Sequence, residues 1–412
     1  MWFLDVQRLI SLGYFLFFLF VLNTRDVYKI SIAVIIFAII MGFKSSAKIK
    51  IKEFRDVLFY LGVVCFFWSY SFDSSFLESV HGDQIVRYIL GFLIFLIIAN
   101  YGLNLKTAVT GAALGCFLSF FIALLQFYEV GRADGYTNAI RFGNLSIVNG
   151  VFCLIALFLL KINLVLRVFY FFGFLFGLGA SILSLSRGGW LFVIILPVFF
   201  IFFNKILSIG RLRLSALLLA FFCALYSLSQ IGFVQERISS IEKEVVGYIN
   251  DPEKYSKTSI GARLEMWGLA LRMGLDKPFT GWGDNGVKSA RHEYIDRGYA
   301  DNSIKKWNHS HSQIIETFAR KGVVGVFLLF FIYLFPLWKL FFWRERLFEV
   351  EDGLRNHASA IIWMGFVFFI GNFVFGLTDY FINMSLGHNY FVMVMMMILG
   401  YGCFLFDKNV GK

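Results

Sequence analysis

Long apolar runs separated by short charged connections are the feature that most restricts the fold of this chain. Of its 412 residues, 58% are hydrophobic and 16% are charged, whereas a soluble domain carries about 25% charged residues. A membrane-spanning helix needs about 20 mostly apolar residues, and its backbone groups must be paired within the same segment. The sequence therefore predicts an all-α, multi-pass membrane protein embedded in the lipid bilayer.

Twelve such runs set the predicted organisation. Lys and Arg are concentrated in alternate connections, so the positive-inside rule places both termini in the cytoplasm, and in the inner membrane of a Gram-negative cell the long polar stretch then faces the periplasm. We predict transmembrane helices 1–9 within residues 1–231, a helical periplasmic domain over 232–321, and transmembrane helices 10–12 within 322–412. The twelve predicted segments are approximately 9–22, 30–43, 57–71, 85–100, 108–128, 145–162, 164–185, 189–203, 213–231, 322–342, 357–378 and 387–407.

The net charge of +11 could indicate a nucleic-acid partner, but the positions of the charges argue against one. Most basic residues lie in short connections, where membrane topology and anionic lipid headgroups explain them. The polar stretch contains no basic patch with interleaved aromatic residues. The five cysteines all lie inside apolar runs and lack metal-site spacing. We expect neither nucleic acid nor a cysteine metal site.

Two arginines stand out on the predicted periplasmic side. Arg187 follows the seventh apolar run, where a charge at membrane depth is unfavourable unless it is paired. Gly188 and Gly189 come next, and glycines allow a backbone to approach a ligand closely. The alternative is that Arg187 reaches lipid headgroups beside Trp190. Arg263 lies on a helix predicted in the polar stretch, where a single arginine is usually a solvated surface residue.

Two histidines lie at the predicted start of the helix that leads into the tenth segment, in Asn308-His309-Ser310-His311. Asn and Ser are favoured helix N-caps, which explains them structurally. A histidine here is well placed as a general base, because the helix dipole favours its neutral form. The His-x-His spacing also suits a metal, but no nearby Cys or carboxylate pattern completes such a site. We expect no metal, and either histidine could be the base.

The residues around His311 resemble the signature of the O-antigen ligase family. That signature is His, then Asn, Ser or Gln, nine residues, Gly, two residues, and Gly or a similar small residue. This chain has His311-Ser312, nine residues, and then Gly322 and Gly325. The match falls where the long polar stretch meets a membrane helix, as in that family.

Further features extend the resemblance over essentially the whole chain. The family has twelve helices with a large periplasmic loop between the ninth and tenth. It places one essential arginine after a membrane helix and another in that loop, and Arg187 and Arg263 occupy these places. The stretch from Pro278 to Gly283 resembles the family's Pro-x-x-Gly-x-Gly motif.

The resemblance implies a glycosyltransferase of lipopolysaccharide biosynthesis. It would transfer a glycan from undecaprenyl diphosphate to the lipid A–core oligosaccharide, without nucleotide, metal or other cofactor. His311 would deprotonate the acceptor hydroxyl, while Arg187 and Arg263 would neutralise the diphosphate leaving group. Displacement with a single base predicts inversion at the anomeric carbon. Spacing within the signature favours His311 over His309.

Secondary candidates for substrate binding lie on two other outward connections. Arg132, Arg141 and Asn144 follow the fifth run and could contact phosphate or sugar, although interfacial anchoring explains them equally well. Asp379 and Tyr380 open the last outward connection, where they could orient an arginine or the acceptor.

Three alternative functions stay open at this point. An O-antigen or capsule polymerase would share donor and topology but add glycan to glycan. An O-linked protein oligosaccharyltransferase would transfer to a protein Ser, and such enzymes generally carry an extra soluble domain after the last helix, where this sequence has few residues. A lipid or polysaccharide transporter would perform no covalent chemistry. Transporters often show internal repeats, which this sequence lacks, and a large polar domain favours an enzyme.

Overall fold

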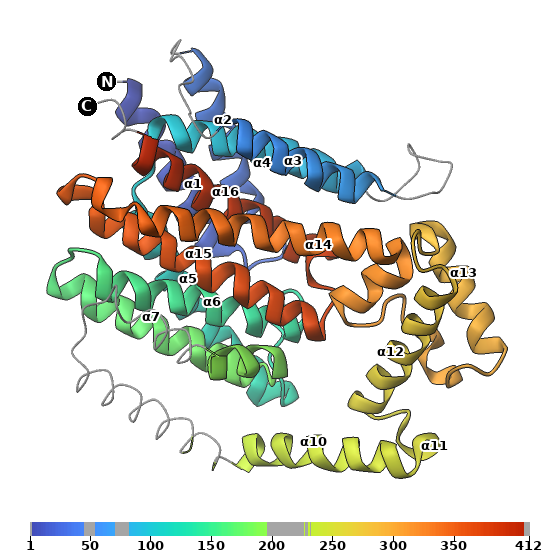
Figure 1. Cartoon of the computed structure of the whole chain (residues 1–412). Coiled ribbons are helices and arrows are strands. Elements are labelled where there is room, and N and C mark those ends of the chain that lie inside the picture. The colour runs from blue at the N-terminus through green and yellow to red at the C-terminus, as the bar shows by residue number, and fades with distance from the viewer. Residues whose placement is uncertain are drawn as a thin grey trace.

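The computed structural model describes residues 2–44, 54–70, 82–195, 226, 230 and 232–407, and all regular structure within them is helical (Figure 1). This agrees with the predicted all-α class. The helices are α1 (Trp2–Phe20), α2 (Lys29–Lys44), α3 (Phe54–Ser69), α4 (Gly82–Tyr101), α5 (Leu105–Val130), α6 (Ala139–Leu159), α7 (Leu164–Leu183), α10 (Gly232–Asn250), α11 (Pro252–Tyr255), α12 (Ser259–Asp276), α13 (Gly283–Asp296), η1 (Asn302–Lys306), α14 (Gln313–Glu345), η2 (Leu347–Glu349), α15 (Asp352–Thr378), η3 (Phe381–Asn383) and α16 (Ser385–Asp407).

Within the described ranges, 7 helices are long and apolar enough to cross a membrane, namely α4, α5, α6, α7, α14, α15 and α16. Helices α1, α2 and α3 coincide with the first three predicted segments but are not among these seven. The predicted segment 189–203 is described only as far as residue 195, and most of segment 213–231 lies outside the described residues. A multi-pass membrane protein is therefore confirmed, and the count of twelve helices stays a prediction.

Local sequence signals explain where several of these helices begin and end. Asn104, Asn138 and Asn163 precede α5, α6 and α7, and each side chain accepts a backbone N–H of the first turn. Such caps satisfy donors that have no partner inside the helix. Helix α5 ends at Val130 and is capped by Gly131, whose φ of 75° is a left-handed conformation that favours glycine.

The long helices form a bundle in which segments distant in sequence lie side by side. Helix α16 packs against α4, α15 against α6 and α14, and α1 against α2 and α5 (Figure 1). Buried hydroxyl groups are satisfied across these contacts, as where Tyr14 donates to the Met393 carbonyl and Tyr60 to the Ile332 carbonyl, each at 2.9 Å. Exposed Phe side chains on α5 and α7, such as Phe117 and Phe172, give the bundle an apolar outer surface that suits lipid.

Helices α10 to α13 and η1 form a polar helical module, residues 232–312, at one end of the bundle (Figure 1). Its small core contains Met266, Leu269 and Met273 of α12 with Val287 and Tyr294 of α13. Helices α12 and α13 also pack against α14, which anchors the module to the bundle. Helix α13 is not among the predicted elements; it begins within the glycine-containing stretch from Gly281 to Gly286.

Helix α14 crosses the predicted boundary between the periplasmic domain and the last transmembrane helices at residue 322. It begins at Gln313, nine residues before the predicted membrane segment, and Gly322 interrupts it with φ 62° and ψ −163°. Only glycine adopts this backbone region readily. The first part of α14 therefore belongs with the polar module, and Gly322 marks the bend where the apolar part begins.

Candidate active site

A cavity of about 460 Å³ lies between the polar module and the adjoining ends of α5 and α6. Four basic side chains line it, and none of its lining residues is acidic. A smaller pocket of about 20 Å³ shares Arg132, Ile140 and Arg263 with the cavity and adds Arg187. His311 lines the larger cavity. The structure thus brings Arg132, Arg187, Arg263 and His311 together from four separate parts of the chain.

His311 is held in an unusual backbone conformation beside the start of α14. Its φ is 52°, a left-handed conformation that is unfavourable by roughly 1–2 kcal/mol for a residue with a Cβ. Its Nδ1 lies 3.5 Å from Asp379 Oδ1. The ring also packs against the rings of His309 and Trp307, with centroid distances of 4.2 and 5.0 Å. With Nδ1 engaged by a carboxylate, Nε2 is the ring nitrogen left for a substrate proton.

Asp379 connects this histidine to α6. It follows the last residue of α15, is 3% exposed, and its Oδ2 lies 4.0 Å from Arg141 Nε. Burial raises the pKa of a carboxyl group, but His311 and the Arg141 guanidinium outweigh burial and lower the pKa of Asp379 below its usual value. Asp379 is therefore ionised at neutral pH. The expectation that it orients an arginine or the acceptor did not anticipate its contact with His311.

The two histidines have different surroundings. Burial, reinforced by the charge of neighbouring His311, lowers the pKa of His309 to about 4, so His309 is neutral at pH 7. Its Nδ1 accepts the His311 backbone N–H at 3.3 Å, and its ring packs against buried Tyr380 at a centroid distance of 5.6 Å. His311 lines the cavity, whereas His309 is not among the lining residues.

Arg187 lies at the start of a described helical stretch, residues 187–195, and reaches α10. Its Nη2 donates to Ser240 Oγ at 3.1 Å and lies 3.5 Å from Glu244 Oε1. The other oxygen of Glu244 accepts the backbone N–H of Ile260, in the first turn of α12, at 2.8 Å. One carboxylate therefore connects Arg187 to the helix that carries Arg263. A lone Glu on an amphipathic helix gave no sequence signal for this role.

The glycines after Arg187 pack against protein. A Cβ on Gly189 would lie 2.6 Å from Ser181 Oγ, and one on Gly188 would lie 3.1 Å from Thr378 Oγ1. Asn144 also adjoins both glycines; it is fully buried and accepts a hydrogen bond from Ser186 Oγ at 3.0 Å. The glycines therefore allow close helix packing, and Asn144 supports the turn before Arg187 from inside α6.

Arg132, which follows α5, and Arg263, on α12, each line both pockets. Arg132 follows the Gly131 cap of α5, and its Nε donates to the Ser184 carbonyl at 3.0 Å. Arg263 lies near the start of α12, where Thr258 Oγ1 accepts the Gly261 N–H at 3.1 Å. A helix N-terminus carries partial positive charge, so the α12 start adds to the cationic character of the cavity.

The glycines of the two predicted motifs pack against each other's backbone. Gly281 has φ 66°, and a Cβ there would lie 2.2 Å from the Arg320 carbonyl carbon. A Cβ on Gly322 would lie 2.4 Å from the Phe279 carbonyl. Val323 N–H donates to the Pro278 carbonyl at 2.7 Å across this contact. The motif glycines therefore allow the module to pack closely against α14, near the loop that carries His311.

Among the residues that the structure describes, no group of three or more His, Cys, Asp or Glu side chains could hold a metal ion. The chemistry available in the cavity comes from one histidine with a carboxylate behind it and from several guanidinium groups. Guanidinium groups bind phosphate and carboxylate oxygens through paired hydrogen bonds. The arrangement suits an anionic substrate from which, or to which, a proton must be transferred.

Fold and site together define a multi-pass membrane protein whose polar module completes a cationic cavity at one end of the helix bundle. Residues 172–330 match the family described as O-Antigen ligase, and this match confirms the predicted resemblance. The matched region contains Arg187, Arg263 and His311, whereas Arg132 and Asp379 lie outside it.

The chain is also similar to an uncharacterised protein of Haemophilus influenzae. The two are 26% identical over 264 residues, which cover 62% of this chain and 65% of the relative.

Proposed function

We propose that this protein is a metal-independent, inverting O-antigen ligase of the bacterial inner membrane. It transfers a glycan from undecaprenyl diphosphate to the lipid A–core oligosaccharide on the periplasmic face. The family assignment supports a glycosyltransferase of the O-antigen ligase and polymerase type. The observation that carries the proposal is the shared cavity, where His311 faces a cluster of guanidinium groups.

His311 acts as the general base in this proposal. Its Nε2 accepts the proton of the acceptor hydroxyl while that oxygen attacks the anomeric carbon of the donor. Asp379, 3.5 Å from Nδ1, orients the ring and stabilises the imidazolium that forms. A positioned base contributes on the order of 10²–10⁴-fold to such a reaction. Attack from the face opposite the leaving group inverts the anomeric configuration.

The arginines act on the leaving group. The bond from the anomeric carbon to the diphosphate oxygen breaks, and negative charge develops on undecaprenyl diphosphate. Arg187 and Arg263 line the small pocket and neutralise this charge, and Arg132 lines the same pocket. Removing one donor that stabilises a developing charge lowers the rate by on the order of 10²–10³-fold. Arg141 instead acts at a distance, through Asp379.

Complementation of a ligase-null Gram-negative strain, supplied with matching donor and core, tests the proposal. Wild type should restore a lipopolysaccharide ladder on gels, and His311→Ala, Arg187→Ala and Arg263→Ala should lose it at normal membrane levels. His292→Ala and Arg297→Ala, which alter the same residue types elsewhere in the module, should retain it.

Two outcomes would contradict the assignment. If wild type leaves the core bare but lengthens the undecaprenyl-linked glycan, the protein is a polymerase. If glycans are unchanged with matched substrates, the proposed transfer reaction is wrong.

A further inference from the structure

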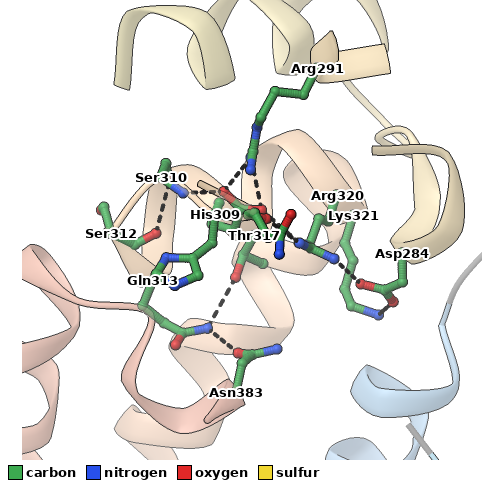
Figure 2. A network of polar contacts seen from close by, with 12 residues as sticks. Asp284, Arg291, His309, Ser310, Ser312, Gln313, Thr317, Arg320, Lys321 and Asn383 are labelled. Carbon is green, nitrogen blue, oxygen red and sulfur yellow. Dashed lines mark hydrogen bonds and ion pairs between the residues drawn. The ribbon is translucent and has the colours of Figure 1, made fainter. Parts of the chain in front are cut away.

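The loop that presents His311 is held by a buried cluster of charges that takes no part in the chemistry proposed above. Glu316, in the first turns of α14, is fully buried. Arg291 Nη2 donates to its two carboxylate oxygens at 3.0 and 2.8 Å, and Arg320 Nε donates to Oε1 at 2.7 Å. Figure 2 shows Arg291 and Arg320 reaching the same carboxylate from different sides.

This cluster also holds the backbone of the loop directly. The Ser310 N–H, one residue before His311, donates to Glu316 Oε2 at 2.7 Å (Figure 2). Arg320 Nη2 donates to the Asn308 carbonyl at 3.1 Å. Two groups of one buried network, the Glu316 carboxylate and the Arg320 guanidinium, therefore hold the chain on the N-terminal side of His311.

The charged network also contacts other elements of the fold. Arg320 and Lys321 lie 3.2 and 3.1 Å from the Asp284 carboxylate, at the start of α13. Lys321 Nζ also donates to the Tyr70 carbonyl, just after α3, at 2.6 Å. The module, α14 and the end of α3 thus meet at these charges, so the clamp on the loop is fixed to three parts of the fold.

His311 needs such a clamp because its conformation is not one that the chain adopts unaided. A left-handed φ persists in a non-glycine residue only when the surroundings enforce it. If the loop relaxed, Nδ1 would leave Asp379 and Nε2 would leave its place in the cavity. Misplacing a catalytic group by about 1 Å can lower a rate by about 10²-fold.

We propose that Glu316 is a positioning residue, whose buried carboxylate sets the His311 loop through Ser310 and through Arg291 and Arg320. This inference rests on the proposed function, because it assigns His311 the role of base. A role in stability alone would instead predict an equal loss of activity whether or not His311 is present.

A double-mutant cycle separates the two roles. Glu316→Gln keeps the side-chain size and removes the charge, and it should lower kcat at least 10-fold with saturating donor and acceptor. In the His311→Ala background the same change should lower the residual rate less than twofold. The Kd for undecaprenyl diphosphate should stay within twofold. An equal loss in both backgrounds would overturn the inference.

Two further variants distinguish a loss of loop positioning from a general loss of folding. Arg291→Lys keeps the charge but loses the forked hydrogen bonds, so it should lower kcat about threefold and only when His311 is present. The matched control is Glu265→Gln, which alters a carboxylate of the same module that accepts the Tyr248 hydroxyl and the Asp301 N–H. It should leave kcat within twofold.

Hydrogen exchange of the full-length protein in nanodiscs gives a measurement that does not depend on activity. In Glu316→Gln the peptide covering residues 307–312 should exchange about 10-fold faster, and in Glu265→Gln it should be unchanged. Unchanged exchange in Glu316→Gln would overturn the inference. If wild type transfers no glycan, the proposed function fails, and exchange alone then decides whether Glu316 holds the loop.

Discussion

Replacing Asp379 by Asn tests the contact between Asp379 and His311. The change keeps the size of the side chain and one acceptor oxygen but removes the negative charge that lies 3.5 Å from His311 Nδ1. We expect a lower kcat, because the charge stabilises the imidazolium that forms as His311 accepts a proton. Binding of the donor should change little, since Asp379 lines neither pocket.

The distance sets the size of the effect. Two unit charges 3.5 Å apart attract by about 5 kcal/mol at an effective dielectric constant of about 20. Only part of this is lost, because the partial negative charge of the Asn oxygen remains near Nδ1 and Asp379 also interacts with Arg141. Taking about half, a loss of about 2–3 kcal/mol lowers kcat by about 30- to 150-fold.

The assay is single-turnover transfer by purified protein in nanodiscs, with lipid-linked glycan and lipid A–core both saturating. The pKa of Asp379 is lowered by His311 and Arg141 against the effect of burial, so the carboxylate is charged throughout the neutral pH range. Between pH 6 and 8 the comparison of wild type with Asp379→Asn therefore measures the loss of a charged carboxylate. Asp134→Asn, a matched change on the exposed connection before α6, should stay within twofold of wild type.

The reasoning is refuted if Asp379→Asn retains kcat within threefold while His311→Ala loses at least 100-fold. His311 would then act without the carboxylate. A loss that appears in the donor KM instead of kcat would also refute it, because it would place Asp379 on the substrate.

Three further predictions follow from the same geometry. The pKa of His309 is about 4 in the folded protein and about 6.5 in the unfolded chain, so the unfolded chain binds more protons between these pH values. The free energy of unfolding should therefore fall on acidification, by about 2 kcal/mol at pH 5. In His309→Gln the thermal midpoint should drop less between pH 7 and 5 than in wild type, and an equal drop would contradict this. Gly322→Ala forces a Cβ to within 2.4 Å of a carbonyl at positive φ and should lower the monodisperse yield in detergent severely, whereas Gly268→Ala, on α12 with open space around it, should not. Arg263→Lys keeps charge but loses paired hydrogen bonds, so we expect transfer to fall about 10-fold, less than in Arg263→Ala; equal rates for the two variants would argue against phosphate recognition.

Much of the secondary structure could be predicted from the sequence, because its signals are local. Apolar length predicts α4 to α7 and α14 to α16, and the helix predicted around Arg263 corresponds to α12, Ser259–Asp276. Helix α13 was missed because glycines usually mark turns, whereas here Gly281 packs against the Arg320 backbone just before the helix and Gly286 lies inside the helix with open space around it. The full number of membrane helices depends partly on residues outside the described ranges.

The membrane environment, the helical class and the family resemblance could all be predicted from residue order, because apolar run length and motif spacing are properties of the linear chain. The surroundings of each candidate residue depend on how the chain folds. Asp379 faces His311, Arg187 faces Glu244, and Glu316 holds Ser310 across connections that carry no periodic signal. The physical reason is that a buried charge is stable only beside a partner, and folding alone brings distant partners into contact.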